Sequence, residues 1–256
     1  MHADEHAVGL ELRRVDLAER EPLRPAVLFA DDRPHRPERT AYARAVRVRV
    51  HAVSVSVDGY MAGPGQDLEN PLGVGAGALH EWIFATRTGR EMIGQPGGSE
   101  DIDDDLFKQG FDGIGATVMG RNMFGPVRGP WGESDWRGWW GDDPPFHHPV
   151  FVLTHHPHPP ISMAGGTTFH FVTDGIDAAL ALAVDAAQGA DIRLGGGAST
   201  IRQFLRAGLI DSMHIAVAPV LLGGGERLFG DEPIAYECER MIASERVTHY
   251  LFGRSS

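Results

Sequence analysis

The stretch "DIRLGGGASTIRQFLRAGLIDSMHIAVAPVLLGGGERLF" (residues 191–229) decides the fold. A short apolar run, residues 191–194, leads into three glycines. The next segment then places Ile201, Phe204 and Leu205 at the spacing of one helix face. A second apolar run, "MHIAVAPVLL", follows the helix. Strand, glycine turn, helix and strand in this order predict a parallel α/β unit with room for a ligand at the turn.

Similar alternation continues over the rest of the chain from Val46 onward. Alternating or continuous apolar runs predict strands at 46–60, 115–120, 149–154, 167–173, 191–194, 213–222 and 245–252. Helical spacing and cap residues predict helices at 77–92, 99–110, 174–189 and 199–208. The fold class is therefore α/β, with a largely parallel sheet flanked by helices.

Residues 1–45 differ from the rest because they mix charge and proline with little apolar periodicity. We expect a poorly packed N-terminal extension. The alternative is a small element that docks on the main domain through "VGLELRRVDL" or "PAVLFA". In either case residues 46–256 form one domain.

Composition limits the partners. The 256 residues carry a formal net charge of −12, which disfavours nucleic acid or an anionic membrane surface as the main partner. The lone cysteine, Cys238, cannot form an internal disulfide, which fits a reducing compartment. The sequence has neither an apolar run of about 18 residues nor a secretory leader pattern. We therefore expect a cytoplasmic protein with no membrane partner.

The glycine turn suits an anionic ligand. Glycines allow a ligand to approach the backbone closely, and the free N–H groups around Ser199, Thr200 and Ile201 would face it. The partial positive charge of a helix N-terminus favours a diphosphate. The pattern is neither G-x-G-x-x-G nor a Walker P-loop, and a turn that serves packing alone is the alternative.

Two further strands end in groups that suit a phosphate. Arg121 directly follows Gly120, and His155 directly follows Thr154. An exposed arginine without a ligand is the alternative for Arg121. Three strand ends with phosphate-compatible groups in one sheet are a stronger signal than any one of them.

These motifs, in order, are "VSVDGYMAGP" (55–64), "ATVMGRNMF" (116–124), "PVFVLTHH" (149–156) and the opening stretch. Together they resemble the dihydrofolate-reductase-like superfamily. Within it they resemble the reductase domain of the bifunctional riboflavin-biosynthesis deaminase-reductases and its stand-alone relatives, over roughly residues 46–254. The resemblance implies a mixed, mostly parallel sheet, NADPH as hydride donor, a small-molecule substrate and, often, a homodimer.

The resemblance also implies a set of cofactor-binding residues. Those on the phosphate side are Gly120, Arg121 and Asn122. Those near the adenosine ribose and its 2′-phosphate are Thr154 and His155. Those around the diphosphate are Gly195, Gly196, Gly197, Ala198, Ser199 and Thr200.

Two acids are candidates for the substrate side. Asp58 could orient the substrate or relay a proton, or it could only hydrogen-bond its own turn. Glu81 corresponds loosely to the pterin-binding carboxylate of dihydrofolate reductases, without their Leu-Pro-Trp context, and a solvated glutamate is the alternative. The riboflavin reductases carry a glutamate before the paired glycines, whereas this chain has Gly195 or Leu194 there. A zinc-deaminase signature is also missing.

We therefore expect an NADPH-dependent reductase of a small heteroaromatic or carbonyl-containing metabolite, related to 5-amino-6-(5-phosphoribosylamino)uracil reductase of riboflavin biosynthesis. The alternative is a noncatalytic nucleotide-binding or dimeric scaffold of the same fold. Four of the five tryptophans lie between residues 123 and 149, where they could form a substrate platform, a dimer contact or simple packing. The histidines that follow lack good zinc geometry, so we expect no metal.

Overall fold

The computed structural model describes residues 46–125, 129–132, 135–230 and 235–255. The strands are β1 (Val48–Ser56), β2 (Tyr60–Ala62), β3 (Ile114–Gly120), β4 (Pro149–Leu153), β5 (Ile161–Ser162), β6 (Thr168–Val172), β7 (Asp191–Leu194), β8 (Ser212–Ala218), β9 (Glu226–Arg227), β10 (Tyr236–Ala243) and β11 (Thr248–Arg254). The helices are η2 (Ala76–His80), α1 (Glu81–Ala85), α2 (Arg87–Met92), α3 (Ile102–Lys108), α4 (Arg121–Phe124), η3 (Ala164–Gly166), α5 (Gly175–Ala187) and α6 (Ala198–Arg206).

Nine of these strands form one sheet in the order β10-β11-β8-β1-β7-β3-β4-β6-β5. The strands from β8 to β6 pair in parallel, whereas β11, β10 and β5 add antiparallel edges. Strands β2 and β9 pair separately. This topology confirms the predicted α/β class with a mixed, mostly parallel sheet. It also brings the carboxyl ends of β8, β1, β7, β3 and β4 to one edge.

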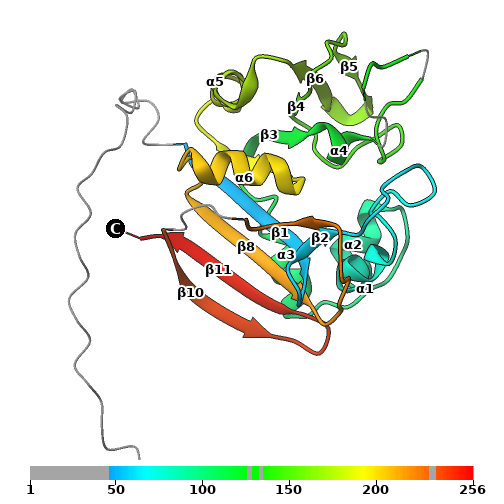
Figure 1. The fold of residues 1–256 in the computed structure, drawn as a ribbon, viewed down its shortest axis with the longest axis vertical. Coiled ribbons are helices and arrows are strands. Elements are labelled where there is room, and N and C mark those ends of the chain that lie inside the picture. The colour runs from blue at the N-terminus through cyan, green and yellow to red at the C-terminus, as the bar shows by residue number, and fades with distance from the viewer. Residues whose placement is uncertain (1–45, 126–128, 133–134, 231–234, 256) are drawn as a thin grey trace, which may run out of the picture. The chain divides into compact units, whose positions relative to one another are not determined.

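Helices cover both faces of the sheet, as Figure 1 shows. On one face, Ile192 and Leu194 of β7 are buried in a cluster that includes Ile201 and Phe204 of α6. This cluster also holds the alanines of α5. On the opposite face, α1 and α3 cover β1 and β8 through a separate apolar cluster. No helix of the described residues is long and apolar enough to cross a bilayer.

The single helix predicted over 77–92 is wrong, because the structure divides it into η2, α1 and α2. Thr86 interrupts it with an extended backbone (φ −77°, ψ 159°), and its side chain accepts a hydrogen bond from Gly89 N at 3.0 Å. A Cβ on Gly89 would collide with the Ile83 carbonyl. The close approach of α1 and α2 thus requires the break and the glycine.

Strand β10 has no counterpart among the predicted strands. Its side chains are almost all exposed, and β11 is its only partner among the described strands. Without a buried face, its sequence lacks the alternation of apolar and polar residues that marks a strand. Pairing with a neighbouring strand creates this element.

Candidate functional site

The glycine turn between β7 and α6 is joined to the end of β3. Gly195 N donates a hydrogen bond to Val118 O at 2.8 Å, and Gly120 N donates one to Gly196 O at 2.8 Å. Two of the strand ends predicted to bind phosphate are therefore one continuous backbone surface. We call Gly120 with residues 195–200 the glycine cradle.

Two glycines of the cradle, Gly120 and Gly196, are required by sterics or backbone conformation. A Cβ on Gly120 would collide with Thr200 Oγ1, so β3 and α6 can approach only at a glycine. Gly196 has φ +109°, a conformation that other residues rarely adopt. At Gly196 and Gly197, a Cβ would meet no atom of the described residues within 4 Å. The cradle therefore has open space beside its backbone.

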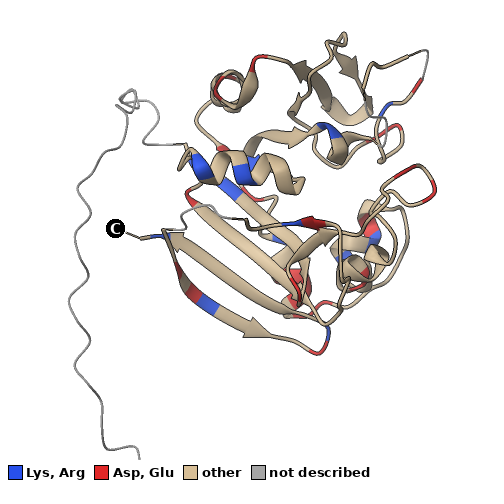
Figure 2. Cartoon of the chain, viewed as in Figure 1, with Lys and Arg blue, Asp and Glu red and all other residues tan. Residues whose placement is uncertain are grey.

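The N-terminus of α6 supplies fewer free amides than predicted. Thr200 N and Ile201 N both donate to Gly197 O at 3.1 Å, which corrects the prediction that these groups face a ligand. Among the described residues, the amides of Ala198 and Ser199 have no acceptor. The charged residues of α6 are all basic (Figure 2). An anion at this end would therefore meet two free N–H donors and a favourable field.

Arg121 begins α4 at the end of β3 and reaches the end of β4. Its Nη1 donates to Thr154 Oγ1 at 3.3 Å. Its Nη2 is buried and has no partner among the residues that the structure describes. Burial lowers the pKa of Arg121 to about 10, so the guanidinium remains charged at neutral pH. An unsatisfied buried donor of this kind fits an oxygen-rich anion.

Trp131 is a member of this region that the sequence did not single out. The Arg121 guanidinium lies over its indole ring, and its Nε1 donates to His156 O at 2.9 Å. The predicted contacts of Asn122 and His155 with the cofactor remain a prediction. The His155 side chain is exposed, and neither side chain forms a hydrogen bond with a described residue.

The tryptophan-rich loop packs against the sheet. Trp131, Trp136 and Trp140 are half-buried on a cluster that contains Phe124 and Phe169. Trp136 Nε1 also donates to Phe124 O at 3.0 Å. The contacts of these three side chains therefore favour a packing role over a flat platform for a substrate.

Asp58 fastens a distant loop. Its carboxylate accepts hydrogen bonds from Leu222 N at 3.1 Å and Gly223 N at 2.7 Å. A hydrogen bond from Ser56, reinforced by these amides, lowers the pKa of Asp58 to about 2. The carboxylate is thus ionised at neutral pH, so a proton relay through Asp58 would begin with the carboxylate as the acceptor. The predicted role in orienting a substrate remains a hypothesis.

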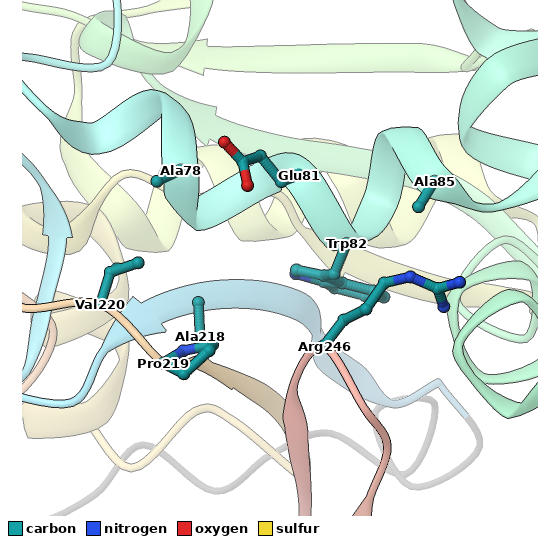
Figure 3. A pocket seen from close by; sticks show the side chains of 8 residues that line it. All are labelled: Ala78, Glu81, Trp82, Ala85, Ala218, Pro219, Val220 and Arg246. Carbon is teal, nitrogen blue, oxygen red and sulfur yellow. The ribbon is translucent and has the colours of Figure 1, made fainter.

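Glu81 lies on the wall of a pocket of about 400 Å³ at the carboxyl end of β8 (Figure 3). Trp82 and Ala218 supply apolar walls, and Arg246 closes the side formed by the β10–β11 turn. The Glu81 carboxylate and the Arg246 guanidinium lie on different sides of the Trp82 indole (Figure 3). The pocket therefore offers an acceptor and a donor at separate places on an apolar surface.

Two carboxylates hold the Arg246 guanidinium in place. Its Nη1 donates to Asp101 Oδ2 at 2.9 Å and to Asp103 Oδ2 at 3.1 Å. These two bonds use the hydrogens of Nη1 alone. The Nε and Nη2 groups bond to no described residue, so they remain available to a ligand.

Behind Asp103 runs a line of imidazoles, which we call the histidine chain: His249 and His214 are buried, and His51 is half-buried. His249 Nε2 lies 3.0 Å from Asp103 Oδ1, His214 Nε2 lies 2.9 Å from His249 Nδ1, and His51 Nε2 lies 3.3 Å from His214 Nδ1. Burial lowers the pKa of His51 to about 3 and that of His214 to about 2, so both are neutral at pH 7. The sequence did not predict this network, because its histidines come from three strands.

The comparisons with known proteins agree with the predicted family. A family model described as the RibD C-terminal domain matches residues 49–250. A protein provisionally named for riboflavin biosynthesis, from Shewanella sp. PV-4, has a similar fold, with a TM-score of 0.52 and 21% identity over 82% of this chain and 99% of that chain. No curated protein matches the sequence.

Two other solved structures are more distant. RibD from Acinetobacter baumannii has a TM-score of 0.48 and 16% identity, and the match covers 82% of this chain and 58% of that chain. Dihydrofolate reductase from Enterococcus faecalis has a TM-score of 0.45 and 14% identity, and the match covers 83% of this chain and 98% of that chain. The family assignment rests on the match over residues 49–250, which spans most of the chain. The chain belongs to the RibD C-terminal domain family.

Proposed function

We propose that the chain is an NADPH-dependent reductase of a small heteroaromatic or carbonyl-containing metabolite. The observation that carries this proposal is the glycine cradle, with open space and two free amides, next to the partly unsatisfied Arg121 at the same sheet edge. Membership of a reductase-like family supports the same reading. The residues present therefore fit a dinucleotide with a phosphorylated ribose.

The proposal gives tasks to the cradle and to the polar residues at the ends of β3 and β4. Residues 195–200 hold the diphosphate, because the Ala198 and Ser199 amides are free there. Arg121 and Thr154 hold the phosphate on the adenosine ribose, with Asn122 and His155 at the periphery of that site. NADPH supplies a hydride when it is bound.

The substrate is proposed to use the pocket beside α1, at the same edge of the sheet. Trp82 offers an apolar wall, Glu81 accepts hydrogen bonds, and Arg246 donates them. A ring or carbonyl compound that carries both donors and acceptors would match these groups. Asp58 supports the site indirectly by holding residues 222–223.

Calorimetric titration with NADPH tests the proposal. Gly197→Asp places a negative side chain in the open space where the diphosphate would lie, and we expect it to abolish binding. Gly197→Ala is the matched control, because the backbone there is not left-handed and a Cβ meets no described atom. If the wild-type protein does not bind NADPH, the proposal is wrong.

Measurement of turnover distinguishes a reductase from a noncatalytic nucleotide-binding scaffold. NADPH consumption with model quinones or pterins, abolished by Arg121→Ala, would support a reductase. Tight NADPH binding with no turnover would instead favour the nucleotide-binding scaffold.

A further inference from the structure

Arg193 lies on the face of the sheet opposite α5 and α6. Its neighbours in β7, Ile192 and Leu194, are buried in the core on the α5 and α6 side, so the arginine points to the other face. There its guanidinium lies 4.6 Å from the ring centroid of Phe111. Thr117 of β3 is its direct register partner.

This arginine has no counter-ion in the described part of the chain. It forms no hydrogen bond or ion pair there, and its Nε is wholly buried. Asp191, two residues earlier on the same strand, already pairs with Arg47 at 3.0 Å and Arg49 at 3.2 Å. A half-buried cation without a partner is costly, because it loses hydration and gains no acceptor in return.

The surroundings add positive charge. Arg49 is the register partner of Arg193 on β1, so two cations stand side by side on neighbouring strands. Burial, together with the charge of Arg49, lowers the pKa of Arg193 to about 10, and the group stays charged at pH 7. Arg193 therefore needs a negative partner that the described residues do not supply.

Two polar side chains, Thr117 and His148, lie beside Arg193. His148 Nε2 lies 2.7 Å from Thr117 Oγ1. Burial, and then the charge of Arg193, lowers the pKa of His148 to about 4, so this imidazole is neutral at pH 7. Thr117 is fully buried, and this neutral pair supplies no counter-ion to Arg193.

We infer that Arg193 binds a small oxygen-bearing anion, a phosphate or a carboxylate, on the α3 side of the sheet. We call this the β7 anion site. Only Nε of Arg193 is wholly buried, so its two unpaired Nη groups are the donors that a ligand can reach. A guanidinium fork matches both kinds of anion. The inference goes beyond the proposed function, because it does not require NADPH.

Titration of the full-length protein with potassium phosphate and with malonate tests the inference, with potassium chloride to match ionic strength. We expect saturable binding by calorimetry. Arg193→Met should weaken this binding about tenfold or more, since it removes charge-assisted hydrogen bonds. Arg240→Met, at an exposed arginine of β10, is the matched control and should bind like the wild type. The anion that binds more tightly, phosphate or malonate, identifies the ligand class.

Stability gives a second readout. In buffer without phosphate or carboxylate, Arg193→Met should melt at a higher temperature than the wild type, because it removes an unpaired cation. Phosphate stabilises most proteins weakly, and Arg240→Met measures that general effect. If Arg193→Met does not fold, Arg193→Gln replaces it, because glutamine is also uncharged but keeps polar atoms.

The glycine cradle with the neighbouring Arg121 is the competing location for phosphate, and Arg121→Met distinguishes it from the β7 anion site. Binding that survives Arg121→Met and is lost in Arg193→Met supports the β7 anion site. Binding lost in Arg121→Met and retained in Arg193→Met overturns it, as does the absence of saturable binding for both anions. Failure of NADPH titration would leave this result unchanged.

Discussion

Gly196 and Gly197 are adjacent in the glycine cradle, but only Gly196 has a backbone conformation that excludes other residues. Gly196 has φ +109°, whereas Gly197 has φ −74°. We expect Gly196→Ala to lower the free energy of unfolding by about 1–3 kcal/mol, the usual cost of a disfavoured conformation. Gly197→Ala should cost much less. Urea denaturation measures both, and equal losses would contradict the assignment.

Arg121 is expected to decide between the two nicotinamide cofactors. Its orphaned Nη2 and its bond to Thr154 suit the 2′-phosphate that NADPH has and NADH lacks. Arg121→Ala should weaken NADPH binding about tenfold or more and leave NADH binding nearly unchanged. Fluorescence titration gives both dissociation constants, with Arg240→Ala as control. Equal constants for the two cofactors in the wild-type protein would refute this prediction.

Between elements, the histidine chain links β1, β8 and β11 and makes stability depend on pH. The pKa values of His51 and His214 are lowered in the folded protein to about 3 and about 2. The unfolded chain takes up these protons near pH 6.5, whereas the folded protein does not. Stability is therefore complete above about pH 6.5 and falls as the pH drops towards 3.

We expect a loss of about 1 kcal/mol per pH unit for each of these two histidines. Urea denaturation at a series of pH values from 7.5 to about 4.5 measures the slope. His214→Asn should flatten it, whereas His155→Asn, at an exposed histidine, should not. An unfolding free energy that stays constant over this range would show that the histidines titrate alike in both states.

The predictions of helices and strands were correct for elements that bury one face in the core. Strands β1, β3, β4, β6, β7, β8 and β11, and helices α3, α5 and α6, lie within the predicted ranges or within two residues of them. Their apolar side chains repeat at the period of the element, so the sequence carries the signal. The helix over 77–92 failed because a packing contact at Gly89 breaks it, and β10 was missed because it has no buried face.

For the whole molecule, the division at residue 45 stays a prediction, because residues 1–45 lie outside the described part of the chain. Deletion of residues 1–45 should leave one cooperative melting transition, since the described residues contain their own apolar core. Differential scanning calorimetry measures this transition. Loss of cooperativity in the truncated protein would show that the N-terminal segment belongs to the core. The homodimer and the cytoplasmic location likewise stay predictions.

The sequence by itself determined the α/β class, the family and the edge of the sheet at which Gly120 and residues 195–200 meet. These features depend on local periodicity and on glycines beside strand ends, which neighbouring residues specify. The tertiary structure decided which side chains and backbone groups pair across long distances in the sequence. His51 and His214 are 163 residues apart, and Asp58 and Gly223 are 165 apart. That no described residue pairs with Arg193 is also visible only in the fold, because side chains distant in sequence become neighbours only when the sheet assembles.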